Sequence, residues 1–366
     1  MTHAPPTARR IEDTRVTHLE IWDAVVNGAS LFSLRSRDAY PALVAEVAAR
    51  EADAGGVATV FLGGGTPSLL APGQLDRILE AVRRRFDLKA PEITLEANPD
   101  DVTETLADAW RATGVNRVSL GVQSFDDAAL RYLGRRHDAE TARRACRTVA
   151  ARFANWSMDL IYGAHPPASW PATLTECVSF AAPHVSCYGL TYEPDTPFGA
   201  RAREAIDEDT ALACYRRSRE LLAGYERYEV SNFALPGFRC RHNLYYWRNL
   251  EYAGFGPGAF SFIDGGRSMN ETALEAYLAR PGRKAERLRL SEREIRVETL
   301  IQHFRLSEGL GRDTYADRFG RELGADFGAV LRSLMQRGLL EERDGRFVPT
   351  ESGFELNNEI GLALVD

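Results

Sequence analysis

Three polar residues stand at the ends of successive apolar runs of the sequence. Glu96, Gln123 and Asp159 each close, or lie within, a run whose neighbours are strongly hydrophobic. A carboxylate is costly to bury unless it binds something, and ribose hydroxyls or an ammonium group are natural partners. Each residue alone could make an ordinary core or loop hydrogen bond. Three of them on three successive strand-like runs favour a ligand site.

A glycine-rich turn precedes these residues. Residues 63–66 read Gly-Gly-Gly-Thr and follow the apolar run 59–62. Glycines let the backbone approach a ligand, and the N–H groups of such a turn can bind a carboxylate. A tight turn without a ligand is the structural alternative. Together with the acidic residues, the turn indicates a ligand that carries ribose, amine and carboxylate groups.

Candidate general bases follow the later strand-like runs, where a substrate would meet such a ligand. They are Tyr162, His165, Tyr188, Tyr192 and Glu193. His165 precedes two prolines, so its loop is stiff. A single loop histidine is more often solvated than catalytic, and this alternative stays open.

A further histidine, His242, lies among aromatic residues in the stretch His-Asn-Leu-Tyr-Tyr-Trp that ends at Trp247. One interpretation is a buried histidine that packs the open side of a barrel. The other is a haem ligand or a base that contacts the substrate. Cys240, two residues before it, is interpreted as a small buried residue rather than a nucleophile.

These residues must be positioned by a repeating scaffold. Strand-like runs alternate with amphipathic helical patterns up to about residue 192, which predicts six βα repeats and a parallel sheet, closed or partly closed as a barrel. Ligands bind such sheets at the carboxyl ends of the strands. The expected strands are His18–Trp22, Thr59–Leu62, Ile93–Ala97, Arg117–Gly121, Ser157–Tyr162 and His184–Leu190, and the expected helices are Tyr40–Ala52, Gly73–Phe86, Thr103–Ala112, Ala139–Arg152 and Pro171–Ala181.

The chain is expected to divide into an arm at residues 1–16, a barrel at 17–285 and a C-terminal domain at 286–366. The stretch 238–270, rich in glycine and aromatic residues, shows few helix signals. The tail has three helical patterns followed by a short strand, an order that resembles a winged helix. Because the tail is as acidic as it is basic, a packing module is favoured over a DNA reader.

Composition limits the functional classes. The 366 residues carry 45 Lys and Arg against 52 Asp and Glu, a net charge of −7 that argues against a nucleic-acid-binding surface. No apolar run is long enough to span a bilayer. The five cysteines are widely spaced, which excludes C-x-x-C motifs and a secreted disulfide framework. A cytoplasmic protein with a small-molecule substrate is expected, and a homodimer is compatible with the sequence.

The motifs together resemble the oxygen-independent coproporphyrinogen-oxidase family of radical S-adenosylmethionine (SAM) proteins, which includes bacterial haem chaperones and several SAM-dependent methylases. The resemblance runs from about residue 17 through GGGTPSLL, EANPD, GVQSFDDAALRYLGRRH, MDLIYG and YEVSNFALPGFRCRHNLYYW into the tail. It implies a partial (βα)6 barrel of the TIM type followed by the C-terminal domain. His242 matches the H-N-x-x-Y-W signature of the haem-chaperone branch.

The resemblance also implies roles for single residues. Gly64, Gly65 and Thr66 would hold the amino-acid end of SAM, and Glu96 would bind near its ribose or amine. The pocket would be completed by Gln123, Arg135 and Asp159.

The first strand departs from the family pattern. Where the family has three cysteines that bind a [4Fe–4S] cluster, the chain has Val26, Ser30 and Ser33. Valine cannot bind iron, and a neutral serine is a poor substitute for thiolate. The sequence therefore predicts that no cluster binds. The amino and carboxylate groups of SAM, which hold the cluster iron in relatives, would need other anchors, and Ser30 is a candidate.

Three functional hypotheses follow. The first is an enzyme that uses the SAM sulfonium in polar rather than radical chemistry, most simply as a methyltransferase acting on a small molecule of specialised metabolism. The second is a haem-binding or haem-delivery protein that uses the His242 signature. The third is a catalytically silent relative that binds SAM. Retention of the whole SAM pocket favours the first hypothesis at this stage.

Overall fold

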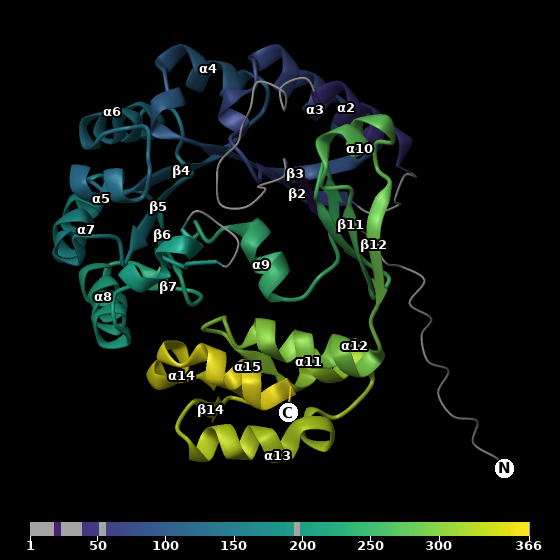
Figure 1. The fold of residues 1–366 in the computed structure, drawn as a ribbon. Coiled ribbons are helices and arrows are strands. Elements are labelled where there is room, and N and C mark those ends of the chain that lie inside the picture. The colour runs from purple at the N-terminus through teal and green to yellow at the C-terminus, as the bar shows by residue number, and fades with distance from the viewer. Residues whose placement is uncertain (1–17, 23–38, 51–55, 194–197, 366) are drawn as a thin grey trace.

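The computed structural model describes residues 18–22, 39–50, 56–193 and 198–365 (Figure 1). Its main feature is a nine-stranded sheet in the order β7-β8-β6-β5-β4-β3-β2-β1-β9. The six expected strands are all present, as β1 His18–Trp22, β2 Gly56–Gly63, β3 Asp87–Ala97, β4 Arg117–Gln123, β5 Trp156–Tyr162 and β6 His184–Gly189. They pair in parallel and in sequence order.

The two ends of the sheet are made by short strands. At one end, β8 (Asn232–Ala234) pairs antiparallel with β6, and β7 (Glu226–Arg227) follows. At the other end, β9 (Ala253–Phe255) pairs in parallel with β1. No pairing joins the two end strands within the described residues, so the sheet is the expected partial barrel rather than a closed one.

Helices cover the convex face of the sheet, where Figure 1 shows them in an arc. The expected helices form as α2 Tyr40–Ala49, α3 Pro72–Arg85, α4 Glu104–Ala112, α6 Ala139–Ala150 and α7 Trp170–Ser179, and α5 Asp127–Tyr132 and α8 Glu208–Leu221 join them. In α3, the residues Leu75, Ile78 and Val82 recur at helical spacing and are fully buried. Each such side chain stabilises the contact by about 1.5–3 kcal/mol.

The two faces of the sheet differ in polarity. Along β3, Ile93 and Leu95 belong to the apolar core under the helices, whereas Glu92, Thr94 and Glu96 alternate with them. Because successive side chains of a strand point to opposite faces, the polar residues face the concave interior. The interior of this partial barrel is therefore lined with polar side chains, unlike the packed apolar interior of a closed barrel.

One helix, α9 (Arg241–Trp247), occupies the concave side of the sheet (Figure 1). The buried Glu92 accepts hydrogen bonds from the backbone N–H groups of Arg241 (3.2 Å) and His242 (3.0 Å). A carboxylate at a helix N-terminus satisfies donors that have no partner within the helix. Few helix signals were expected in this stretch, and α9 was not predicted.

A small antiparallel sheet follows, with β10 (Phe260–Ile263), β11 (Gly266–Asn270) and β12 (Lys284–Arg289). The short helix α10 (Leu274–Ala279) lies between β11 and β12. Gly254 is required before this sheet, because a Cβ atom there would lie 1.9 Å from the carbonyl oxygen of Phe260. The expected domain boundary between residues 285 and 286 falls inside β12 and stays a prediction.

The C-terminal part is mainly helical and has its own apolar core. Its helices are α11 Glu292–His303, α12 Arg312–Phe319, α13 Leu323–Gln336, α14 Glu351–Glu355 and α15 Asn357–Val365, and its sheet has the order β13 (Leu310–Gly311), β15 (Arg346–Pro349), β14 (Leu340–Arg343). This confirms the expected C-terminal helical domain, and the single short strand that was expected is β15, the middle strand of this sheet. In the described part of the chain, no helix combines the length and apolar character needed to cross a membrane.

Candidate functional site

The predicted ligand residues of the first strands meet at the carboxyl edge of the sheet. Glu96 at the end of β3 accepts a hydrogen bond from the backbone N–H of Gly64 (3.1 Å), which follows β2. Burial, and then the nearby charge of Asp159, raise the pKa of Glu96 to about 7 despite that hydrogen bond and the charge of Arg117. A carboxyl group with this pKa exchanges its proton near neutral pH.

Glycines leave space beside these side chains. A Cβ atom at Gly63 would lie 2.5 Å from the ring of Phe61 and 3.0 Å from the Glu96 carboxylate. A Cβ atom at Gly121 would lie 2.8 Å from Nε2 of Gln123, which is buried and adopts a positive φ of 66°. Glycine at both positions therefore lets the side chains of Phe61, Glu96 and Gln123 pack closely against the strand ends.

The turn after β2 is tied to the loop after β3. The side-chain amide of Asn98 donates to Oγ1 of the buried Thr66 (3.1 Å). Ser68 Oγ donates to Asp101 (2.7 Å) and accepts from the backbone N–H of Asn98 (3.4 Å). The glycine-rich turn is thus held in place by its own threonine and serine, and Thr66 lies in this network rather than free for a ligand.

Asp159 on β5 is held by two hydroxyl groups. Ser119 Oγ donates to its Oδ2 (2.7 Å), and Ser157 Oγ donates to its Oδ1 (2.8 Å). Both oxygens of Asp159 therefore act as hydrogen-bond acceptors, and they can accept further hydrogen bonds from a ligand.

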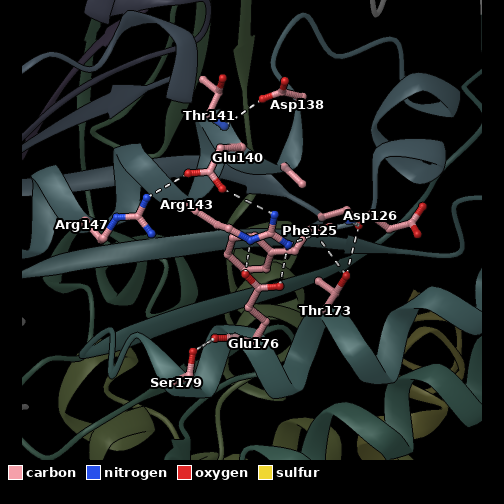
Figure 2. Close-up of polar contacts among 12 residues, drawn as sticks. Phe125, Asp126, Asp138, Glu140, Thr141, Arg143, Arg147, Thr173, Glu176 and Ser179 are labelled. Atoms are coloured by element: carbon pink, nitrogen blue, oxygen red, sulfur yellow. Dashed lines mark hydrogen bonds and ion pairs between the residues drawn. The ribbon is translucent and has the colours of Figure 1, made fainter.

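The turn that follows Gln123 at the end of β4, with Phe125 and Asp126, is fixed from outside the barrel (Figure 2). Thr173 Oγ1 lies 3.1 Å from Ser124 Oγ and accepts from the backbone N–H of Phe125 (3.3 Å). Arg143 of α6 binds Glu176 of α7 through two hydrogen bonds, of 2.5 and 3.0 Å, and its guanidinium lies over the Phe125 ring. Side chains of α6 and α7 thus hold the turn that follows Gln123 in place.

Arg135 lies after α5, beside the loop that follows β3. Burial lowers the pKa of its guanidinium, and the charge of Asp100 opposes this shift. Its Nε–H is buried and meets no acceptor among the described residues. A buried donor without an acceptor is costly, so this group fits a ligand that brings one.

The candidate bases do not converge. Tyr162 packs against Trp170 of α7, on the helix side of β5, and so points away from the concave interior. The hydroxyl groups of Tyr192 and Tyr132 are hydrogen-bonded at 2.7 Å. Nε2 of His165 is hydrogen-bonded to the carbonyl oxygen of Glu204 at 2.7 Å, and its ring contacts the ring of Tyr132. These loop residues form an aromatic cluster of their own, outside the Glu96 site.

Two further candidate bases lie at or beyond the end of β6. Tyr188 is 41% exposed at the sheet edge, and its hydroxyl pKa lies above the usual range because of burial of that group and the charge of Asp159. Glu193 is exposed in the loop that follows. The structure gives neither side chain a direct contact with Glu96 or Asp159.

His242 is placed as a packing residue. It is 1% exposed, its Nδ1 lies 2.9 Å from Oγ1 of Thr59 on β2, and its ring stacks on Phe61 at 4.9 Å. The ring of Tyr246 contacts the His242 ring in a T-shaped arrangement, with the ring centroids 5.2 Å apart. Of the two interpretations of the H-N-x-x-Y-W stretch, this geometry supports the buried histidine.

The positions on which the cluster prediction depends, Val26, Ser30 and Ser33, lie outside the described residues. All five cysteines are free and buried on separate elements, and the described residues contain no group of His, Cys, Asp and Glu that could hold a metal ion. They therefore offer no set of three thiolates that fits a cluster, and we derive no step through one.

The residues that surround Asp159 and Glu96 inside the partial barrel were not predicted from the sequence. These are Arg117, Ser119, Ser157, His184 and Tyr228, and the first four face the interior from β4, β5 and β6. The signal for them was the alternation of polar with apolar residues along strands that a buried parallel sheet would make apolar throughout.

Comparison with known proteins defines the class. A model of the radical SAM superfamily matches residues 26–166, and a model of the HemN C-terminal domain matches residues 290–356. The structure of coproporphyrinogen III oxidase (HemN) from Escherichia coli superposes with a TM-score of 0.80 and covers 96% of this chain and 90% of its own. At 21% identity, this similarity shows the radical SAM fold alone.

Closer relatives define the family. The heme chaperone HemW of Lactococcus lactis is 34% identical over 315 residues, which are 82% of this chain and 83% of the relative. HemW of Synechocystis is 38% identical over 291 residues, which are 74% and 69% of the two chains. The chain therefore belongs to the HemN- and HemW-like family of radical SAM proteins, as its motifs predicted.

The same comparisons correct the preferred functional hypothesis. The two relatives described above align over most of their length and are heme chaperones, and none of the proteins compared above is a methyltransferase. The methyltransferase interpretation was therefore wrong. The comparisons also give no support to the description of the protein as cluster-less.

Proposed function

We propose that this protein binds haem and delivers it to an acceptor protein, and that it binds SAM at the carboxyl edge of its sheet. The observation that carries the proposal is the similarity to heme chaperones along most of both chains. The preserved edge of the sheet, with Glu96, Gln123 and Asp159, supports the SAM part.

The edge residues suit SAM by their hydrogen-bonding chemistry. Glu96 and Asp159 offer acceptors to ribose hydroxyls or to the ammonium group, and Arg135 offers a buried donor without an acceptor in the described chain. SAM supplies a positively charged sulfonium, which two neighbouring carboxylates stabilise. The side chains of this protein bind and orient the ligand in this proposal.

The structure changes the choice of haem ligand. Among the histidines whose side chains are described, four are 5% exposed or less, namely His137, His184, His242 and His303. His165 is the half-buried one, and it lies beside Tyr132 in the aromatic cluster past the sheet edge. Neutral imidazole is a common axial ligand of haem iron, and aromatic rings pack well against a porphyrin. We propose His165 as the ligand.

Haem binding is tested by titrating purified protein with haemin and following the Soret absorbance. The wild type should develop a shifted band, and it should transfer the haem to apomyoglobin. His165→Ala should weaken or shift the band, whereas His242→Ala should lose stability but keep the band.

A wild type with no shifted band would refute the haem proposal. A band that depends on His242 rather than His165 would refute the ligand assignment alone. The cytoplasmic location, the lack of nucleic-acid and membrane partners, the small-molecule substrate and a homodimer stay predictions.

A further inference from the structure

Beneath the sheet edge, a buried chain of hydrogen bonds leads away from Asp159. Ser157 Oγ lies 2.8 Å from Oδ1 of Asp159 and 2.8 Å from Nδ1 of His184. On the far side of that ring, Nε2 of His184 lies 2.8 Å from the Tyr228 hydroxyl. His184 is 0% exposed and Tyr228 is 1% exposed, so water does not compete for these contacts.

The directions of these hydrogen bonds follow from the donors available. Ser157 donates its single hydroxyl proton to Asp159, so it must accept a hydrogen bond from His184. Burial and the charge of Arg117 hold the pKa of His184 well below its usual range, so the ring is neutral with its proton on Nδ1. Nε2 then accepts the proton of Tyr228.

All the hydroxyl and ring protons of this chain therefore point toward Asp159. We propose that His184 and Tyr228 are positioning residues of the ligand site, which fix the Asp159 side chain as a hydrogen-bond acceptor through Ser157 without touching the ligand. Asp159 then selects ligand groups that donate, such as ribose hydroxyls or ammonium, and disfavours carboxylate or phosphate. This inference rests on the proposed SAM site.

Tyr228, at the end of the hydrogen-bond chain farthest from Asp159, is bound to the C-terminal part of the protein. The carbonyl of Tyr228 accepts from the backbone N–H of Ser307 (3.0 Å) and from its hydroxyl (3.2 Å). The backbone N–H of Val230 donates to the carbonyl of Arg305 (3.1 Å). Fixed main-chain contacts on one side thus hold the Tyr228 hydroxyl in place on the other.

The test measures SAM affinity by calorimetry in full-length variants. Tyr228→Phe removes only the hydroxyl at the far end of the hydrogen-bond chain. Ser157→Ala removes the hydroxyl that joins His184 to Asp159. One neutral hydrogen bond corresponds to about a 5-fold change in affinity, so each variant should bind SAM about 5-fold more weakly or worse. Tyr315→Phe is the matched control, because Tyr315 is 1% exposed and its hydroxyl donates to Asp326 (2.6 Å) in the C-terminal core.

A second measurement separates positioning from a general loss of stability. The ¹⁵N shifts of His184 should show the Nδ1–H form in the wild type, and Tyr228→Phe should reduce the share of that form. In an Asp159→Asn background, Tyr228→Phe should no longer change SAM affinity, because the acceptor that the chain serves has been neutralised.

The possible results are distinct. Wild-type protein that does not bind SAM would refute the proposed site and this inference with it. Wild-type binding that stays unchanged in both Tyr228→Phe and Ser157→Ala, or that falls equally in Tyr315→Phe, would refute the positioning role and leave the proposed site standing. If Tyr228→Phe or Ser157→Ala fails to fold, the other variant decides the test, since both interrupt the same series of hydrogen bonds.

Discussion

The affinity for SAM should rise with pH, and Glu96 should be the residue responsible. In the free protein, the pKa of Glu96 lies at about 7 because its carboxyl group is buried near Asp159. SAM brings a positive sulfonium and a positive ammonium group, both of which favour the ionised form of Glu96. Below the pKa, binding must therefore first remove a proton from Glu96.

The size of the effect follows from that pKa. One pH unit below it, about nine-tenths of the molecules carry the proton, so the apparent affinity at pH 6 should be about 10-fold lower than at pH 8. Binding should release about 0.9 proton at pH 6 and about 0.1 proton at pH 8.

The proton count is measured by isothermal titration calorimetry in two buffers that differ in ionisation enthalpy, repeated from pH 5.5 to 8.5. Glu96→Gln keeps the shape of the side chain and removes its titration, so this variant should bind more weakly at pH 8 and with no release of protons. An affinity that is flat across pH 6–8 in the wild type, or a proton release that persists in Glu96→Gln, would refute the reasoning.

Three further predictions concern stability and space. Because the pKa of Glu96 is raised, the folded state gives up this proton at a higher pH than the unfolded state, and stability is lost as pH rises from about 4.5 to about 7. Glu96→Gln should therefore be more stable than the wild type at pH 8, by up to about 3 kcal/mol in the free energy of unfolding measured in urea. Gly63→Ala should reduce SAM affinity at least 10-fold, because its Cβ atom would collide with Phe61 and crowd Glu96. The far-UV circular dichroism of this variant should stay native. Unchanged affinity would show that the ligand does not approach this edge. Glu92→Ala should destabilise the fold by about 2–3 kcal/mol, because two backbone N–H groups at the start of α9 lose their acceptor, and Glu104→Ala on the surface of α4 serves as the near-neutral control in the same thermal melts.

The sequence was sufficient for the regular part of the fold. The strands β2 to β6 follow from apolar runs bounded by turns, and their carboxyl ends placed Glu96, Gln123 and Asp159 at one edge. The pairing of β9 with β1 could not be read from the sequence, because it joins segments more than 200 residues apart and the three residues Ala253–Phe255 have no pattern of their own.

The supporting residues of the site were also hidden. His184 and Tyr228 come from segments 44 residues apart, and only the folded chain brings their polar atoms within 2.8 Å. His242 was correctly placed in an aromatic neighbourhood, yet its role depended on burial against Thr59, which is 183 residues away. The correction of the methyltransferase interpretation depended on similarity along most of the chain, which no single motif of the sequence supplies.

The main-chain contacts between Tyr228 and Ser307 bear on how the protein can be dissected. A fragment that ends before α11 would lose residues 305–307, which pair with residues 228–230 through main-chain hydrogen bonds, and would thereby free the Tyr228 end of the hydrogen-bond chain to Asp159. Truncation would therefore damage the barrel as well as remove the tail, and a loss of ligand binding in such a fragment would be misattributed to the missing domain. Point substitutions in the intact protein are the means of assigning haem and SAM to separate regions.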